Sequence, residues 1–162
     1  IWKKVTATIP DARLVMMGSG SADTVKALER MISAHALDDN ITLFGHATPQ
    51  QLAQNMRDSN VFLSTSHEEG WGISLCEGLA CGLRCVVYDL PAFKKMKPFI
   101  TAVPKFDEET ISAKLVDAIH AGRSTSKPPQ LSSEQQVFLN SISWKIIASE
   151  EERIFNDQVS FT

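Results

Sequence analysis

Short apolar runs alternate along the chain with amphipathic stretches of three- to four-residue period. Runs of this length, bounded by glycine or polar turn residues, indicate β-strands, and an unbroken apolar run such as 14–17 is typical of a strand buried on both faces. Strands are predicted at 14–17, 41–44, 60–65, 83–88 and 99–103. Helices are predicted at 1–8, 23–36, 49–59, 72–81, 91–96 and 107–122, and two more begin near 132 and 143. This alternation predicts an α/β fold with a parallel sheet covered by helices on both faces.

The pattern also predicts how the chain is organised. Residues 1–141 are expected to form one domain, because no composition shift interrupts the alternation. Within it, 124–133 is rich in Ser, Lys and Pro, has no periodicity, and is interpreted as a surface loop. Residues 142–162 are predicted to form a C-terminal helix. The chain does not begin with Met and opens on a helical pattern already under way, so we expect it to be part of a longer protein.

Composition narrows the class of protein. With 162 residues, 43% hydrophobic content and a net charge of −3, the chain suits one globular domain and lacks the basic surface of a nucleic-acid-binding protein. No apolar run approaches the roughly 20 residues of a membrane span, and no secretory signal is visible. The three cysteines lie close together at 76, 81 and 85, which argues against a disulfide framework and against zinc spacing. A cytoplasmic protein without a metal is expected, with the cysteines as packing residues.

Three loops at the carboxyl ends of predicted strands carry glycine or charge, at 18–21, 45–46 and 66–72. Ligands of parallel sheets bind at that edge, so these loops are expected to line one crevice. In the third loop, Gly70 and Gly72 let the backbone approach a ligand, and the helix that follows directs its free N–H groups into the loop. That arrangement suits phosphate. Gly18-Ser19-Gly20 offers a similar turn, although such a short motif is as often a plain tight turn.

Two carboxylates accompany these turns. Glu69 precedes Gly70, and Glu77 lies eight residues further along, inside an otherwise apolar helix. Charged residues are rare on apolar helix faces without a partner, which is either a neighbouring Lys or Arg or a ligand. Beside a phosphate site, carboxylates accept hydrogen bonds from hydroxyl groups such as those of ribose or a sugar. The combination predicts a polyol that carries a diphosphate, such as a nucleotide-linked sugar.

These residues carry a resemblance. Glu69-x7-Glu77, with Gly-x-Gly after the first Glu and Gly-Leu-Ala-Cys-Gly after the second, resembles the E-x7-E signature of retaining glycosyltransferases of the GT-B fold, most like family 4 (group 1). Several other segments resemble that family in the same order: 14–20, 41–56, 88–91 and 143–144. The resemblance covers nearly the whole chain. It implies the Rossmann-like C-terminal half of a GT-B fold, which binds the sugar donor.

The resemblance also implies roles for individual residues. Glu69 would face the donor hexose near the reacting carbon as the catalytic carboxylate, and Glu77 would bind the ribose hydroxyls. The remaining donor-binding positions would be Gly18 and Gly20 on the phosphate side, Phe44, Gly45 and His46 at the base, and Gly70, Trp71, Gly72, Ile73 and Ser74 around sugar and phosphate. On residue type alone, His46 and His67 are expected to be ordinary loop histidines.

For the whole enzyme, the resemblance implies retaining transfer of a hexose from a UDP- or GDP-linked sugar, without a metal cofactor, in polysaccharide or glycoconjugate biosynthesis. The acceptor would bind a separate N-terminal domain. Helix 142–162 would cross to that domain, and peripheral membrane contact could arise through it. The chain departs from the family pattern in lacking the glycine- and Arg-containing loop and the Lys that clamp the phosphates. It also has Trp71 where Phe is commoner and Lys95 near an expected acidic position. The chain alone is therefore expected to be inactive.

Alternative functions remain open from the sequence. One is a nucleotide-binding or interaction domain without transferase activity, and another is a GT-B epimerase or hydrolase of nucleotide sugars. A dinucleotide oxidoreductase using Gly18-x-Gly20 is disfavoured. The third glycine of that fingerprint is missing, and so is the acidic residue about 20 positions later.

Overall fold

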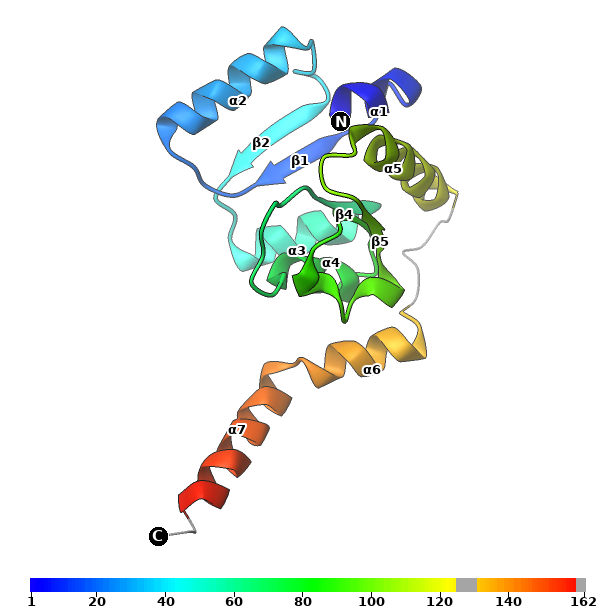
Figure 1. The fold of residues 1–162 in the computed structure, drawn as a ribbon. Helices are drawn as coiled ribbons and strands as arrows, with labels where there is room; N and C mark the ends of the chain where they lie inside the picture. The colour runs from blue at the N-terminus through cyan, green and yellow to red at the C-terminus, as the bar shows by residue number, and fades with distance from the viewer. Residues whose placement is uncertain (125–130, 160–162) are drawn as a thin grey trace. The chain divides into compact units, whose positions relative to one another are not determined.

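The computed structural model describes residues 1–124 and 131–159 (Figure 1). The chain divides into two compact units, residues 1–128 and 129–162. The first unit carries all the described strands and is the one that contains the predicted site residues.

The helices and strands of the first unit begin and end within about two residues of the predicted bounds. In chain order they are α1 (Trp2–Thr8), β1 (Leu14–Met17), α2 (Ala22–Ala34), β2 (Ile41–Gly45), α3 (Pro49–Asp58), β3 (Val61–Ser64), α4 (Ile73–Ala80), β4 (Arg84–Tyr88), β5 (Thr101–Val103) and α5 (Glu108–Arg123). In place of the helix predicted at 91–96 there is one short 3₁₀ helix, η1 (Pro91–Phe93), and a second, η2 (Lys97–Phe99), follows beyond the predicted range.

Side-chain caps fix several helix starts. The Thr48 side chain accepts a hydrogen bond from Gln51 N–H, and the Gln51 side chain accepts one from Thr48 N–H, which is a full capping box before α3. The Ser21 hydroxyl accepts from Thr24 N–H at the start of α2. These local signals explain why the sequence predicted the helix bounds so closely.

The strands form two parallel sheets rather than the single sheet expected. One sheet pairs β1 with β2, with Leu14 opposite Ile41, and the other has the order β3-β4-β5, with Val61 opposite Arg84. Within the described residues, no strand pairs with the second edge of β1 or of β3. The prediction of parallel strands is confirmed, and the prediction of one continuous sheet is wrong for this chain.

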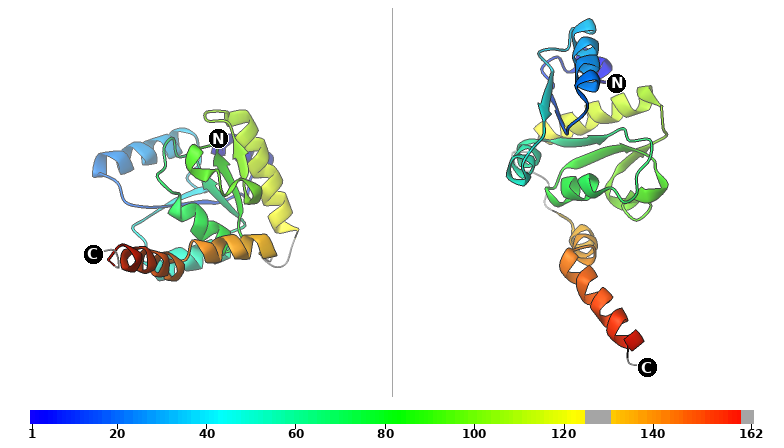
Figure 2. Two further views of the ribbon diagram at one scale, coloured as in Figure 1. Left: turned by 60° about the horizontal axis from the view of Figure 1, so that its bottom comes forward. Right: turned by 90° about the vertical axis from the view of Figure 1, so that its left-hand side faces the viewer.

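The main core lies between the β3–β5 sheet and helices α1 and α5. Its buried members come from α1 and the turn after it, from β4 and β5, and from α5: Val5, Ile9, Ala12, Val86, Tyr88, Val103, Ile111, Leu115 and Ile119. The opposite face of the sheet meets α4, where a Cβ atom on Gly78 would lie 3.0 Å from Phe62 Cγ. Helices therefore cover both faces of this sheet, as predicted. Figure 2 shows α5 running alongside it, while α2 accompanies the β1–β2 pair.

The smaller sheet is less well covered. Val15 is 41% exposed and Met16, whose side chain projects from the opposite face, is 39% exposed. Helix α2 contributes no fully buried residue. The prediction that strand 14–17 is buried on both faces is therefore wrong. The reason is physical: β1 is an edge strand here, so no neighbouring strand shields its side chains.

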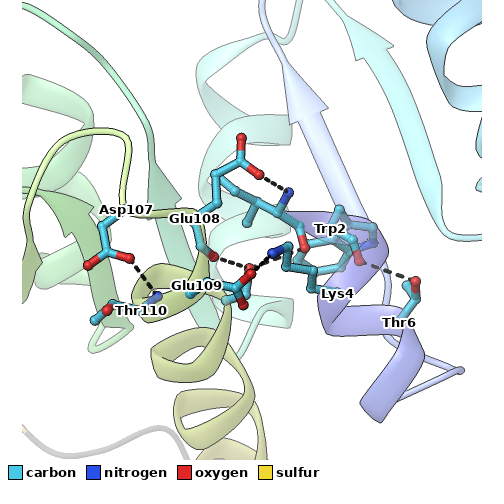
Figure 3. Close-up of polar contacts among 9 residues, drawn as sticks. Trp2, Lys4, Thr6, Asp107, Glu108, Glu109 and Thr110 are labelled. Atoms are coloured by element: carbon cyan, nitrogen blue, oxygen red, sulfur yellow. Dashed lines mark hydrogen bonds and ion pairs between the residues drawn. The ribbon is translucent and has the colours of Figure 1, made fainter.

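Polar contacts join α1 to the start of α5 (Figure 3). The Lys4 ammonium forms an ion pair with Glu109, and the Asp107 carboxylate caps α5 by accepting from Thr110 N–H at 3.0 Å. The Ser112 hydroxyl donates to Glu108 O at 2.6 Å. Because Lys4 and Glu109 are exposed, their pair contributes little stability, and burial of Val5 contributes more.

The second unit contains α6 (Ser133–Ser141) and α7 (Trp144–Val159). A second capping box, between Ser132 and Gln135, starts α6 close to the predicted position. Of the surface loop predicted at 124–133, residues 125–130 lie outside the described residues. The domain boundary at 141/142 and the crossing role of 142–162 stay predictions, although α6 groups with α7 rather than with residues 1–128.

Candidate functional site

The loops after β1 and β2 meet at one edge of the smaller sheet. Gly18, the first residue after β1, donates its N–H to the O atom of Gly45, the last residue of β2, at 2.9 Å. Both glycines have positive φ, 143° and 77°, conformations that residues with a Cβ atom rarely adopt. A Cβ atom at either position would have no heavy atom within 4 Å, so the surface beside this bond is open. The structure thus brings together the predicted segments 18–20 and 44–46, with Phe44 and His46 exposed beside them.

The loop between β3 and α4 occupies the carboxyl edge of the second sheet, as expected. Gly72 is the N-cap of α4, with φ of 88°. A Cβ atom on Gly72 would lie 2.6 Å from Phe93 Cε1, so the loop packs tightly on η1 and only glycine fits there. No side chain caps the first turn of α4. The first N–H groups of this helix therefore remain available to an anion.

The two carboxylates flank this helix start. Glu69 is exposed in the loop, and Glu77 is half-buried on α4. Across the described residues, neither side chain takes part in an ion pair or a hydrogen bond. A Lys or Arg partner, the ordinary explanation for a carboxylate on an apolar helix, is thus not seen for Glu77.

Large apolar side chains are exposed at the same loop. Trp71 is 43% exposed and Ile73 is 63% exposed. Ser74 is also exposed on the first turn of α4. An exposed indole beside free helix N–H groups offers a flat apolar surface next to an anion site, which suits a sugar or a base joined to a phosphate.

The loop between β3 and α4 has no direct polar contact with the loops after β1 and β2 in the described residues. In the described part of the chain, no hydrogen bond or ion pair links residues 18–20 or 44–46 to residues 69–77. A single crevice lined by all three loops therefore stays a prediction.

An aromatic cluster that the sequence did not predict lies at the carboxyl ends of β3, β4 and β5. The rings of His67 and Phe106 meet edge to face with centroids 4.7 Å apart, and Tyr88 lies 6.4 Å from His67 and 6.2 Å from Phe106. Lys105 Nζ also donates to His67 O at 3.4 Å. These contacts join the β3–α4 loop, which carries Glu69, to the β5–α5 loop. His67 lies in a loop, as expected, and its ring contacts Phe106.

Phe106 is the unusual member of this cluster. Its φ is +66°, a conformation that is rare for residues with a bulky side chain, and the side chain is 65% exposed. Backbone outliers of this kind cluster at active sites and ligand clamps, which makes Phe106 a candidate for a functional role. The only sequence signal was its place directly before Asp107, the N-cap of α5, and that signal does not predict a ring contact.

The cysteines behave as packing residues. Burial raises the pKa of the Cys85 thiol to about 12, and burial followed by the charge of Glu77 raises the pKa of Cys76. Both thiols stay protonated at neutral pH and are poor nucleophiles and metal ligands. Among the described residues, no three His, Cys, Asp or Glu side chains lie together as a metal site would require.

Comparison with known proteins identifies the family. The family model for glycosyl transferases group 1 matches residues 1–122, which include every predicted site residue. The chain belongs to the group 1 glycosyltransferases. The resemblance carried by Glu69-x7-Glu77 is thereby confirmed at the level of the family.

Individual relatives agree with this placement. The chain is 34% identical over 83 residues to the UDP-N-acetylglucosamine–peptide N-acetylglucosaminyltransferase GtfA subunit of Streptococcus pneumoniae. The aligned segment is 51% of this chain and 16% of that protein. It is 30% identical over 94 residues to a phosphatidyl-myo-inositol mannosyltransferase of Mycobacterium tuberculosis, covering 57% of this chain and 24% of that protein. The matched segment is thus about a quarter or less of these relatives' length.

A solved structure supports the fold. S. aureus TarM, crystallised as a mutant with Fondaparinux, alpha-GlcNAc-glycerol and UDP, superposes with a TM-score of 0.80 at 17% identity, over 95% of this chain and 31% of TarM. The predicted fold class is confirmed: an α/β, Rossmann-like unit that matches the C-terminal half of a GT-B fold. Within the described residues, no helix is both long enough and apolar enough to span a membrane.

Proposed function

We propose that this chain is the donor-binding domain of a retaining glycosyltransferase and holds a nucleotide-diphosphate sugar at the loops after β1, β2 and β3. One observation carries the proposal: the uncapped first turn of α4, fixed by Gly72 against Phe93, lies between two carboxylates that have no partner in the described chain. Family membership supports the same reading.

The start of α4 binds the diphosphate in this account. The N–H groups of Ile73 and Ser74 and the positive end of the helix dipole meet the phosphate oxygens. Negative charge grows on the diphosphate as the glycosidic bond breaks. Hydrogen-bond donors that are already oriented, here the N–H groups of α4, stabilise that charge without reorganisation. They are therefore the main catalytic contribution of this domain.

The carboxylates bind hydroxyl groups on either side of the diphosphate. Glu77, half-buried and unpaired, accepts hydrogen bonds from the ribose hydroxyls, and Glu69 accepts them from the donor hexose near the reacting carbon. The open surface at Gly18 and Gly45, with Phe44 and His46, contacts the base and the outer phosphate. The donor is UDP- or GDP-linked, and no metal takes part in these contacts.

Transfer itself needs more than this chain. We propose that a further domain of the whole enzyme binds the acceptor and supplies the cationic groups that clamp the phosphates, and that residues 1–162 alone bind the donor weakly. We propose a cytoplasmic location, since a reducing compartment keeps Cys76, Cys81 and Cys85 as free thiols.

Equilibrium binding of UDP to the chain extended at its N-terminus by its native sequence tests this function. Glu77→Ala should weaken UDP binding about 10- to 150-fold, because a hydrogen bond to a charged group contributes about 1.5–3 kcal/mol. Glu29→Ala, an exposed carboxylate on α2, serves as the control and should bind like the unaltered protein. Equal affinity in all three proteins would remove the role assigned to Glu77.

A further inference from the structure

Glu69 lies on a short stretch of the β3–α4 loop between two anchored residues. On one side Gly72 packs against Phe93 of η1, and on the other the ring of His67 meets the ring of Phe106. Residues 68–70 between them are exposed and form no hydrogen bond or ion pair within the described chain. The position of Glu69 therefore depends on the two anchors rather than on polar contacts of its own.

Both anchors are near enough to control Glu69. It follows His67 by two residues and precedes Gly72 by three. Two residues of extended chain span at most about 7 Å and three about 11 Å, so a shift of either anchor is passed on to Glu69. The Gly72 anchor is secure because the ring of Phe93 is 1% exposed. His67 is itself exposed, so its anchor is only as firm as the residue that it contacts.

That residue, Phe106, has an exposed ring but a firmly held backbone. Its carbonyl oxygen accepts a hydrogen bond from Glu108 N–H at 3.0 Å, and Asp107 N–H donates to Pro104 O at 3.2 Å. The turn leads directly into α5, whose residue Ile111 is fully buried in the main core. Phe106 is therefore attached to one of the best-packed elements of the unit.

The β5–α5 loop contacts both the side chain and the backbone of His67. The rings of His67 and Phe106 lie 4.7 Å apart at an interplanar angle of 66°, which is the favourable edge-to-face arrangement. Lys105 Nζ donates to His67 O at 3.4 Å, a long bond from an exposed lysine that adds little. The ring of Tyr88, 4% exposed, lies 6.4 Å from His67 and gives the pair a buried neighbour.

Folding stability does not account for Phe106. Its side chain is 65% exposed and buries little apolar surface, while its φ of +66° is unfavourable for a bulky residue. Residues in such conformations persist where surrounding structure holds them, and they concentrate at functional sites. The contact with His67, two residues from Glu69, connects this strained residue to the proposed donor site.

We propose, on the basis of the role proposed for Glu69, that Phe106 is a positioning residue for sugar transfer. Its ring holds His67 and so keeps the Glu69 carboxylate at the donor hexose. Phe106 does not itself touch the reacting atoms. Small displacements of a reacting group lower turnover strongly, so loss of this ring should affect the chemical step more than nucleotide binding.

Backbone order in the whole enzyme, measured by ¹⁵N relaxation, tests the positioning itself. Phe106→Asn removes the ring and suits the positive φ. The order parameters of Glu69 and Gly70 should fall toward about 0.6, the range of flexible backbone, while that of Ile73 on α4 stays unchanged. Phe106→Tyr keeps an aromatic ring and should keep the order of the unaltered protein. Equal order at Glu69 in all three proteins would overturn the proposal.

Turnover provides a second measurement, as release of UDP or GDP from a panel of UDP- and GDP-hexoses by the whole enzyme. Phe106→Asn should lower kcat about 10-fold or more and leave UDP affinity unchanged, since UDP carries no hexose. Phe106→Tyr should restore most of kcat. His67→Ala, at an exposed loop position, should lower kcat to a similar extent. The double variant should be no slower than either single one, because both substitutions break the same contact.

Three kinetic results would contradict the proposal. They are full turnover in Phe106→Asn, losses that add in the double variant, and a loss of UDP affinity equal to the loss of kcat. The last would mean that the ring supports the whole site rather than Glu69. Comparison with Glu69→Gln separates this outcome from failure of the proposed function. Full turnover in Glu69→Gln ends the role of Glu69, whereas full turnover in Phe106→Asn beside an impaired Glu69→Gln ends the positioning role alone.

Discussion

Gly72 lies directly against the ring of Phe93, and a Cβ atom on Gly72 would come within 2.6 Å of Phe93 Cε1. This contact ties the N-cap of α4 to η1, the 3₁₀ helix that follows β4. Since Gly72 also has φ of 88°, both backbone conformation and space restrict the position to glycine. The start of α4, where the diphosphate is proposed to bind, is therefore held rigidly before any ligand arrives.

Gly72→Ala should destabilise the protein and weaken nucleotide binding together. The left-handed conformation costs an L-residue about 1–3 kcal/mol, and displacement of Phe93 adds to it. Gly70→Ala is the matched control for stability alone, because a Cβ atom there meets nothing within 4 Å. Urea unfolding and UDP titration measure both effects. A Gly72→Ala protein as stable as the Gly70→Ala protein would show that the packing at Phe93 is not a constraint.

Glu69→Gln should lower turnover more than it lowers donor affinity. Glu69 is placed at the reacting hexose, so loss of its charge affects the transition state more than the bound nucleotide. Glu68→Gln, its exposed neighbour, is the control and should keep turnover close to that of the unaltered protein. Initial rates and KM of the N-terminally extended enzyme, measured with UDP- and GDP-sugars, separate the two effects. Undiminished turnover in Glu69→Gln would end the catalytic assignment.

Phe106→Asn should leave the protein as stable as before, or raise its stability by about 1 kcal/mol. Asn tolerates positive φ much better than Phe does, and the ring that it replaces is largely exposed. The substitution also removes the edge-to-face contact with His67, so the NMR signals of the β3–α4 loop should shift. Thermal unfolding provides the first readout. A marked loss of stability would mean that the ring is a packing residue rather than a strained surface group.

Cys85 should resist alkylation in the folded protein. Burial raises the pKa of its thiol from 9.0 to about 12, so very little thiolate exists at pH 8. Cys81 is half-buried and should react first with iodoacetamide, as followed by mass spectrometry. The raised pKa also means that Cys85 favours folding below pH 9 and that this contribution is lost as pH rises toward 12. Labelling of Cys85 as fast as Cys81 at pH 8 would contradict its burial.

The helices and strands were predictable because their signals are local. Three examples are the Thr48–Gln51 capping box, the apolar spacing of α5 and Gly72 as the N-cap of α4. Each acts within a few residues. The sequence also predicted that the glycines at 18 and 45 lie together, since parallel strands share one carboxyl edge.

Features that depend on contacts between distant parts of the chain were not predictable in the same way. The run at 14–17 is as apolar as a fully buried strand, yet Val15 and Met16 are exposed, because burial depends on neighbouring strands rather than on the run itself. The contact between His67 and Phe106 joins loops 39 residues apart, and neither residue belongs to a motif. Periodicity cannot reveal a pairing of this kind.

The position of the bound nucleotide tests the central claim most directly. UDP and GDP, added to the N-terminally extended protein, should shift the backbone amide signals of Gly18, Gly45 and residues 69–77, while those of α2 stay in place. Shifts confined to those segments would support one donor site assembled from three loops. Unmoved signals at 69–77 with both nucleotides, at concentrations up to several millimolar, would contradict it.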